Sequence, residues 1–192
     1  QNIPIKGEIN GSCLVNASLL SKILSNIAKS SDVITFEKID NVLRIQSNKN
    51  HTDVDLYNES MFPKIQNGGS KILTIQKDVF VDVVKNVAFC AATTEIKPEI
   101  ASVYLYTKDG QLYSAATDSY RLAEKHVFFE TDNQLNILIP QKNIGQILSI
   151  LEQEKENNLD IIKNGDQIIF ETKNSFISTR LTDGSFPDYK QL

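Results

Sequence analysis

A short stretch near the middle of the chain, residues 115–123, combines hydroxyl, carboxylate, phenol and guanidinium side chains. The spacing of Thr117, Asp118 and Arg121 is typical of a strand, a tight turn and a second strand. In that arrangement the Asp118 carboxylate bonds the backbone of the turn, and Arg121 pairs with a carboxylate. An alternative is acid–base chemistry at Asp118 and Arg121, but no second general acid or base follows at a recognisable spacing. The residues alone predict a structured turn.

The rest of the chain carries no motif for catalysis or for a cofactor. It contains no Gly-rich phosphate loop, no Gly-x-Ser-x-Gly elbow and no His-Glu-x-x-His helix. The two histidines, His51 and His126, fall in expected strands and are expected to face solvent. The two cysteines, Cys13 and Cys90, lie far apart, which favours buried free thiols over a disulfide or a zinc site. We therefore expect no catalytic residue, no metal and no cofactor.

Composition indicates an ordinary globular chain, with 41% hydrophobic and 23% charged residues among 192. No apolar run is long enough for a membrane helix, and we expect a cytoplasmic protein without a membrane partner. The chain has 20 Lys and Arg residues against 24 Asp and Glu residues, a net charge of -4. This balance argues against tight nucleic-acid binding by bulk charge, although a localised basic face is compatible with it.

One pattern of elements recurs three times along the chain. Each unit, of about 60 residues, has a strand, an amphipathic helix and three antiparallel strands. Apolar residues at i, i+3, i+4 and i+7 predict the helices, over 20–27, 80–87 and 144–151. Alternation and turn residues predict the strands, at 3–9, 33–37, 42–45, 52–56, 72–75, 103–107, 111–116, 122–129, 136–140, 159–163, 167–171 and 175–181. The spacing from Leu20 to Ile144 equals the spacing from Phe62 to Phe186, which favours a structural repeat.

Two such units are needed to enclose a core, because one unit covers only one face of its helix. Residues 72–192 are expected to form one complete α+β domain, with two helices on one side of an antiparallel sheet. Residues 1–66 are expected to be half of a preceding domain, joined through a linker at 67–71. We expect a fragment of a longer protein, in which residues 1–66 associate or are partly disordered because their half-core faces water.

The outward faces of the three predicted helices are polar with a mild excess of positive charge. They carry Lys22, Lys85 and Lys142 respectively. Ordinary solvent-exposed helix faces are one interpretation. The other is a weakly basic, hydrated surface that meets a phosphate backbone without reading bases.

Three stretches carry a resemblance to a known family. They are Lys97-Pro98-Glu99-Ile100-Ala101-Ser102-Val103, Ala116-Thr117-Asp118-Ser119-Tyr120-Arg121-Leu122-Ala123 and Ser178-Thr179-Arg180-Leu181-Thr182-Asp183-Gly184-Ser185-Phe186-Pro187-Asp188-Tyr189. Together with the repeated unit, they resemble the bacterial sliding clamp, the beta subunit of DNA polymerase III. The resemblance covers essentially the whole chain, and Ser119 stands where the family usually has glycine.

This resemblance implies a DNA clamp fold and a function in DNA replication. The family's subunit is a non-catalytic processivity factor with three domains, and two subunits form a ring around duplex DNA. By this resemblance, residues 1–66 are the second half of the first domain and 72–192 are the middle domain. The implied partners are duplex DNA, a second subunit, the DNA polymerase III catalytic subunit, the clamp loader and repair proteins, in the bacterial cytoplasm.

The resemblance also implies site residues. Partner proteins dock through short motifs with leucine and phenylalanine anchors, and the matching pocket residues are Thr117, Tyr120, Arg121, Leu122, Ile100, Lys97, Pro187 and Leu192. The DNA-facing positions are Lys142, Gln141, Thr94, Lys22 and Lys85. Arg121 and backbone groups of the turn would fix polar parts of the peptide, and buried apolar anchors would supply most of the affinity. The alternative function is a stand-alone peptide-binding module that does not encircle DNA.

Overall fold

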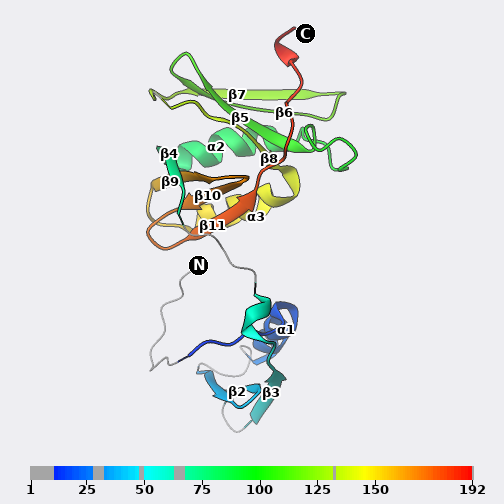
Figure 1. Ribbon diagram of the computed structural model, residues 1–192, viewed down its shortest axis with the longest axis vertical. Coiled ribbons are helices and arrows are strands. Elements are labelled where there is room, and N and C mark those ends of the chain that lie inside the picture. The colour runs from blue at the N-terminus through cyan, green and yellow to red at the C-terminus, as the bar shows by residue number, and fades with distance from the viewer. Residues whose placement is uncertain (1–10, 28–32, 48–49, 63–67, 132, 192) are drawn as a thin grey trace. The chain divides into compact units, whose positions relative to one another are not determined.

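The computed structural model describes residues 11–27, 33–47, 50–62, 68–131 and 133–191 (Figure 1). The chain divides into a small unit, Pro4–Ile65, and a large unit that includes Gln66–Leu192. The strand expected at residues 3–9 lies outside the described residues. The α+β class is confirmed, because three helices of 11 to 13 residues pack on antiparallel sheets.

The small unit contains one helix and one three-stranded sheet. Helix α1 (Ala17–Ile27) is followed by β1 (Thr35–Ile39), β2 (Val42–Ser47), β3 (Asn50–Asp55) and a short 3-10 turn at Glu59–Met61. The strands pair antiparallel in the order β1-β2-β3. Only Leu43, Ile45 and Val54 are buried in its apolar cluster, and no residue of α1 is fully buried. The helix is amphipathic as predicted, and these three are the buried apolar residues among the part of the unit that the structure describes.

The prediction of buried free thiols was correct for Cys90 and wrong for Cys13. Cys90 is buried, whereas Cys13 is exposed. Cys13 lies on the chain just before Leu14, which bridges to Tyr57. It belongs to the exposed run of residues 11–13, outside the apolar cluster of Leu43, Ile45 and Val54.

The large unit repeats one order of elements twice. The first half contains β4 (Ser70–Gln76), α2 (Lys77–Ala88), β5 (Ser102–Lys108), β6 (Gln111–Thr117) and β7 (Leu122–Phe128). The second half contains β8 (Asn136–Pro140), α3 (Gln141–Gln153), β9 (Asn158–Asn164), β10 (Gln167–Glu171) and β11 (Phe176–Arg180). These bounds confirm the helices and strands predicted from apolar spacing to within a few residues.

The eight strands form two four-stranded antiparallel sheets. Their orders are β7-β6-β5-β8 and β11-β10-β9-β4 (Figure 1). The first strand of each half therefore leaves its own half and pairs with the sheet of the other, β4 with β9 and β8 with β5. This exchange ties the two halves together, since neither four-stranded sheet is complete without a strand from the other half.

The beginning of β4 also corrects the expected linker at 67–71. Ser70 and Lys71 already pair with Lys163 and Ile162 of β9. Gly69 precedes them at a φ of +140°, and a Cβ there would lie 2.5 Å from the carbonyl oxygen of Lys163. Only glycine tolerates that approach, so the strand starts directly after it.

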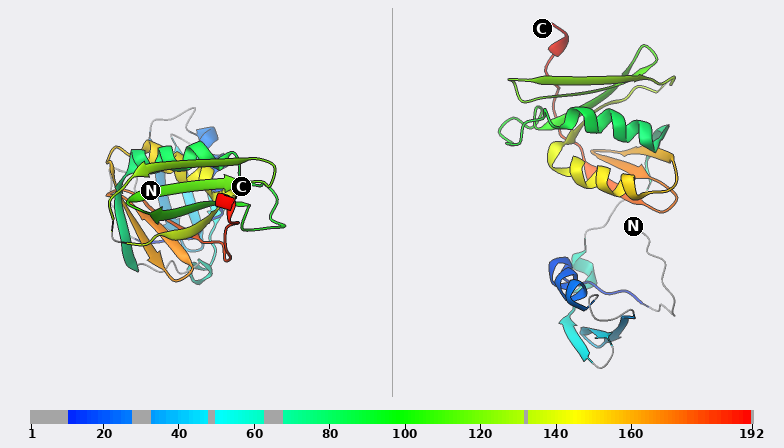
Figure 2. Two further views of the ribbon diagram at one scale, coloured as in Figure 1. Left: turned by 90° about the horizontal axis from the view of Figure 1, so that it is seen from above. Right: turned by 180° about the vertical axis from the view of Figure 1, so that it is seen from behind.

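The core of the large unit lies between its two helices and its two sheets. Helices α2 and α3 run side by side (Figure 2). Their buried apolar residues are those at the predicted spacing, namely Phe80, Val83, Val84, Val87, Ile144, Ile147, Leu148 and Leu151. Phe80 packs against Phe170 of β10 with 5.1 Å between ring centroids, which joins helix and sheet. The opposite face of the β7-β6-β5-β8 sheet is directed away from this core.

Candidate functional site

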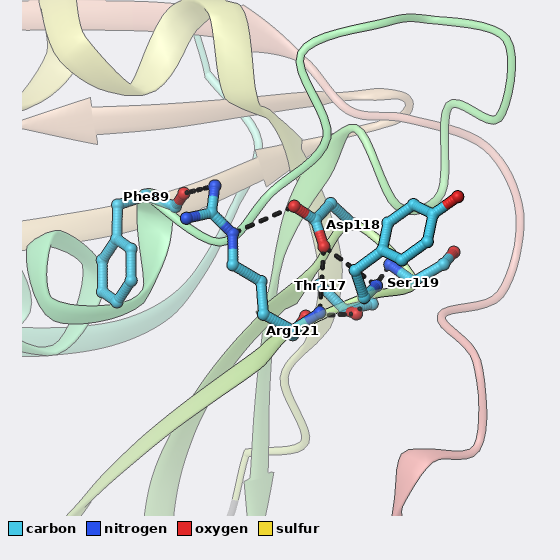
Figure 3. A network of polar contacts seen from close by, with 6 residues as sticks. Phe89, Thr117, Asp118, Ser119 and Arg121 are labelled. Carbon is cyan, nitrogen blue, oxygen red and sulfur yellow. Dashed lines mark hydrogen bonds and ion pairs between the residues drawn. The ribbon is translucent and has the colours of Figure 1, made fainter.

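The turn between β6 and β7 is held by its own side chains (Figure 3). Thr117 Oγ1 donates to the carbonyl oxygen of Arg121 at 2.7 Å and accepts from the Ser119 N–H at 3.1 Å. Asp118 Oδ1 accepts from the N–H groups of Tyr120 and Arg121, each at 3.0 Å. Asp118 therefore bonds the backbone of the turn, as the sequence predicts.

The side chain of Arg121 extends this network to helix α2. Its Nε donates to Asp118 Oδ2 at 2.9 Å, and its Nη2 donates to the carbonyl oxygen of Phe89 at 3.0 Å. Its Cζ also lies 5.9 Å from the centroid of the Phe89 ring. Phe89 is the C-cap residue of α2, so the cation sits where the negative end of the helix dipole favours it. Arg121 thus fixes the turn against α2, and only its remaining N–H groups are free to meet a peptide.

The carboxylate of Asp118 is suited to accepting hydrogen bonds rather than to acid–base chemistry. The backbone N–H of Tyr120, followed by the N–H and the guanidinium of Arg121, lowers the pKa of Asp118 below its usual 3.8 although partial desolvation opposes the shift. A carboxylate held ionised by three donors is a structural acceptor. The geometry supports the turn interpretation over general acid catalysis.

Apolar surface accompanies the turn. Leu122, the first residue of β7, pairs with Thr117 and is 41% exposed, and Tyr120 at the tip of the turn is 98% exposed. The loop before β5 reaches the same end of the sheet, because β5 and β6 are antiparallel neighbours. That loop carries Lys97, which is exposed, and Ile100, which is half-buried. Leucine and phenol side chains at this end offer contact area for an apolar peptide anchor.

The C-terminal segment passes the same loop before it crosses the sheet. Thr182 Oγ1 and Ser102 Oγ lie 2.8 Å apart, and Gly184 takes a φ of +126° where a Cβ would lie 2.9 Å from Glu99 Cγ. The positive φ favours glycine at 184, since other residues are strained in this conformation. Pro187 follows and is exposed, whereas Leu192 lies outside the described residues. The turn and the loop therefore lie at one end of the β7-β6-β5-β8 sheet, and the C-terminal segment passes that end at Thr182 and Gly184.

Two of the predicted DNA-facing positions lie beside a small cavity at the start of α3. The cavity has a volume of about 170 Å³ and is lined in part by Gln141, Lys142 and Glu95. Lys142 Nζ pairs with Glu95 Oε1 at 2.8 Å, and Thr94 is the exposed neighbour of Glu95. The structure thus brings Gln141, Lys142 and the loop of Thr94 together.

The other two predicted DNA-facing lysines lie on separate helices. Lys85 of α2 pairs with Glu152 of α3 at 2.7 Å, and both side chains are largely exposed. Lys22 is exposed on α1 and belongs to the small unit. Both predicted lysines of the large unit therefore have a carboxylate partner within the chain, which the sequence did not indicate.

A group of aromatic residues on the sheet was missed by the sequence analysis. Tyr104, Tyr106, Tyr113 and His126 stack in a row across β5, β6 and β7, with neighbouring ring centroids 4.7 to 5.3 Å apart. The alternation of Tyr104 and Tyr106 in β5 was the available signal, since i and i+2 share a face of a strand. The cross-strand pairing with Tyr113 and His126 depends on register and was not predictable from local pattern.

Among the described residues, no helix is long and apolar enough to cross a membrane. Within the same ranges, no group of three or more histidine, cysteine, aspartate or glutamate side chains is arranged to hold a metal ion.

The architecture of the chain matches solved structures of one class of protein. It aligns with the DNA polymerase III beta chain of Streptococcus pneumoniae at a TM-score of 0.86 and 25% identity, covering 96% of this chain and 49% of that one. It aligns with the beta subunit from Thermotoga maritima at a TM-score of 0.84 and 21% identity, covering 96% and 51%. The fold is therefore that of a sliding clamp, which confirms the fold class predicted from the motifs.

Sequence comparison gives the family. Residues 74–188 match the family model of the DNA polymerase III beta subunit, central domain. The chain belongs to this family, and the resemblance predicted from its motifs is confirmed. The beta sliding clamp of Halalkalibacterium halodurans is 28% identical over 200 residues, covering all of this chain and 51% of the relative. That of Bacillus subtilis is 28% identical over 151 residues, covering 78% and 39%. The chain spans about half the length of the curated relatives that it matches.

Proposed function

We propose that this chain is part of a replicative sliding clamp, a non-catalytic processivity factor of DNA polymerase III in the bacterial cytoplasm. The observation that carries this proposal is the match of residues 74–188 to the central domain of the beta subunit. In this proposal, residues 72–192 act as the middle domain of the clamp and residues 1–66 as the second half of the first domain. Self-association then closes a ring around duplex DNA.

Partners dock, in this proposal, in a pocket at the end of the β7-β6-β5-β8 sheet. Thr117, Tyr120, Arg121 and Leu122 contribute the turn, Lys97 and Ile100 the loop, and Pro187 and Leu192 the C-terminal segment. A leucine or phenylalanine anchor buried against Leu122 gains about 1.5 to 3 kcal/mol from leaving water. Short extended motifs of the polymerase catalytic subunit, the clamp loader and repair proteins are the expected ligands. Binding of this kind is exchangeable, which suits a shared docking site.

The DNA contact in this proposal is weak and independent of sequence. Its proposed contacts are Lys142, Gln141, Thr94 and Lys85 in the large unit and, separately, Lys22 in the small unit. The pairing of Lys142 with Glu95 and of Lys85 with Glu152 reduces the charge available to phosphates. The net charge of -4 has the same effect. A ring that holds DNA by topology needs little affinity, and strong phosphate contacts would oppose sliding.

A peptide titration tests the pocket. A labelled peptide with leucine and phenylalanine anchors is titrated into the chain and into its Leu122→Ala and Thr52→Ala variants, the latter being an exposed control in the small unit. Loss of the leucine contact is expected to weaken binding about tenfold, in line with about 1.5 kcal/mol. The control is expected to bind as the parent does. Equal affinity of all three proteins would show that the pocket is assigned to the wrong residues.

Topological retention tests the ring. The protein is mixed with the clamp loader, ATP and a nicked circular duplex, and the bound fraction is measured before and after the circle is cut. A protein that encircles DNA is expected to stay on the circle in high salt and to leave after linearisation. Salt-sensitive binding that is the same on both forms would instead support a peptide-binding module without encirclement.

A further inference from the structure

The C-terminal segment that carries Pro187 is attached to the exposed face of the β7-β6-β5-β8 sheet by few side chains. Phe186 stacks on Tyr104 with 5.0 Å between ring centroids, and Tyr189 meets the edge of Phe186 at 5.8 Å. Tyr189 is only 9% exposed, whereas Pro187 and Asp188 beside it are exposed. Tyr189 is therefore the residue by which this segment is anchored.

Tyr189 is held by polar groups from two strands, and the next residue, Lys190, contacts a third strand. Its hydroxyl donates to Glu124 Oε2 on β7, and it lies 2.8 Å from the hydroxyl of Tyr106 on β5. Lys190 Nζ pairs with the same Glu124 oxygen at 2.5 Å and lies 5.2 Å from the ring centroid of Tyr113 on β6. One carboxylate thus accepts from two consecutive residues of the segment.

The electrostatics agree with this geometry. Burial disfavours the ionised form of Glu124, but donation by Lys190 and by Tyr189 outweighs it and lowers the pKa of Glu124 below its usual 4.5. Burial and the hydrogen bond to Glu124 raise the pKa of Tyr189 above its usual range. At neutral pH, Glu124 is therefore an ionised acceptor and Tyr189 a neutral donor, which is the arrangement of a charge-assisted hydrogen bond.

The positions of these residues relate the cluster to the pocket. Glu124 follows Leu122 by two positions on β7, so the two side chains share the exposed face of the sheet. Tyr189 follows Pro187 by two positions on the segment. The bond between Glu124 and Tyr189 therefore joins the strand that presents Leu122 to the segment that presents Pro187.

A groove of about 520 Å³ lies between the segment and the sheet. Its lining includes Phe186 and Tyr189 of the segment, Tyr104 and Tyr106 of β5, and Lys108 and Asp109 at the β5–β6 hairpin. The segment contacts the sheet through Phe186, Tyr189 and Lys190.

We propose that Glu124 and Tyr189 form a clasp that positions residues 186–191 on the sheet and thereby holds Pro187 in the place where it contributes to peptide binding. The positioning of the segment by Glu124 and Tyr189 does not depend on the proposed function. The expected effect on peptide binding does rest on it. Glu124 and Tyr189 are positioning residues, since they act through the segment and through Pro187. Without the clasp, the segment leaves the sheet and the pocket loses one side.

Two measurements on the whole chain test the clasp. The first is hydrogen exchange of the amides of residues 188–190, which requires no ligand. The second is the affinity for the labelled leucine–phenylalanine peptide. The variants are Tyr189→Phe, Glu124→Ala, the conservative Glu124→Gln and the double variant of Tyr189→Phe with Glu124→Ala. Tyr57→Phe and Glu130→Gln are matched controls, because both side chains are exposed away from the cluster.

Tyr189→Phe and Glu124→Ala are each expected to speed exchange at 188–190 about tenfold, the effect of losing one charge-assisted hydrogen bond. Each variant is expected to weaken peptide binding by a similar factor, while hydrogen exchange in α2 and α3 stays unchanged. Glu124→Gln keeps an acceptor for Tyr189 and is expected to restore part of both effects. The effect of the double variant is expected to be smaller than the sum of the two single effects, because both changes break the hydrogen bond between Tyr189 and Glu124. Each change also removes a separate contact, with Lys190 for Glu124→Ala and with Tyr106 for Tyr189→Phe.

The outcomes separate the clasp from the proposed function. Exchange at 188–190 that is the same in the parent, Tyr189→Phe and Glu124→Ala proteins would overturn the clasp. Faster exchange with unchanged peptide affinity would overturn its link to the pocket. A parent chain that binds no peptide would count against the proposed pocket, and the exchange measurement would still decide whether the clasp holds the segment.

Discussion

The Nη2 of Arg121 donates to the carbonyl oxygen of Phe89 at 3.0 Å, which joins the β6–β7 turn to the C-terminal end of α2. We expect Arg121→Ala to lower the free energy of unfolding by about 1 kcal/mol, because the helix end loses both a donor and a nearby cation. Arg180→Ala is the matched control, since its exposed guanidinium pairs only with the exposed Asp166. Arg180→Ala is expected to lower the free energy of unfolding by less than about 0.5 kcal/mol. Equal losses in urea denaturation would show that the Phe89 contact does not stabilise the fold.

Because the Asp118 carboxylate stabilises this turn in its ionised form, we expect the stability of the protein to fall at low pH. Since donation by Tyr120 and Arg121 lowers the pKa of Asp118 below 3.8, its stabilising contribution is fully present above pH 3.8. The contribution is lost as the pH falls through the lowered folded-state pKa. A carboxyl NMR titration is expected to place the Asp118 midpoint below 3.8. In Asp118→Asn, this part of the loss of stability at low pH is expected to disappear, whereas a midpoint above 3.8 would contradict the network.

Ser119 occupies a backbone conformation that glycine adopts more easily. Its φ is +77°, in the left-handed region, and its N–H donates to Thr117 Oγ1. Ser119→Gly keeps that donor and relieves the strain of the side chain, so we expect the protein to gain about 1 kcal/mol of stability in thermal unfolding. Ser119→Ala removes the hydroxyl without relieving φ and is expected to leave stability unchanged. A gain in the alanine variant instead would show that the hydroxyl, not the backbone, carries the cost.

Local pattern was sufficient for most elements and for the turn. The spacing of Phe80, Val83, Val84 and Val87 predicted α2, because a helix must bury one stripe of its surface. The order of Thr117, Asp118 and Arg121 predicted the turn and its carboxylate bond, since these contacts lie within five residues of each other.

Features that depend on distant pairing were not predictable from the same patterns. The exchange of β4 and β8 between the two halves is a matter of which strands pair with each other. The local alternation of either strand does not specify its pairing partner. The bond between Glu124 and Tyr189 likewise joins residues 65 positions apart. The exposure of Cys13 likewise depends on which apolar residues pack together in the small unit, which its sequence neighbours do not reveal.

The paired lysines of the large unit predict how the chain meets duplex DNA. Lys142 and Lys85 each form an ion pair with an exposed carboxylate, that of Glu95 and of Glu152 respectively. A DNA phosphate must therefore displace the carboxylate before it can pair with either lysine. We expect Glu95→Gln to raise affinity for a linear duplex about two- to fivefold at low salt. The slope of log affinity against log salt concentration is expected to become steeper by the amount that corresponds to about one phosphate contact. Lys142→Ala is expected to weaken binding and to abolish the gain from Glu95→Gln when the two changes are combined. Glu171→Gln, on β10, changes the net charge equally and separates this effect from bulk charge. If fluorescence anisotropy shows the same gain for Glu171→Gln as for Glu95→Gln, the increase comes from net charge and not from release of Lys142.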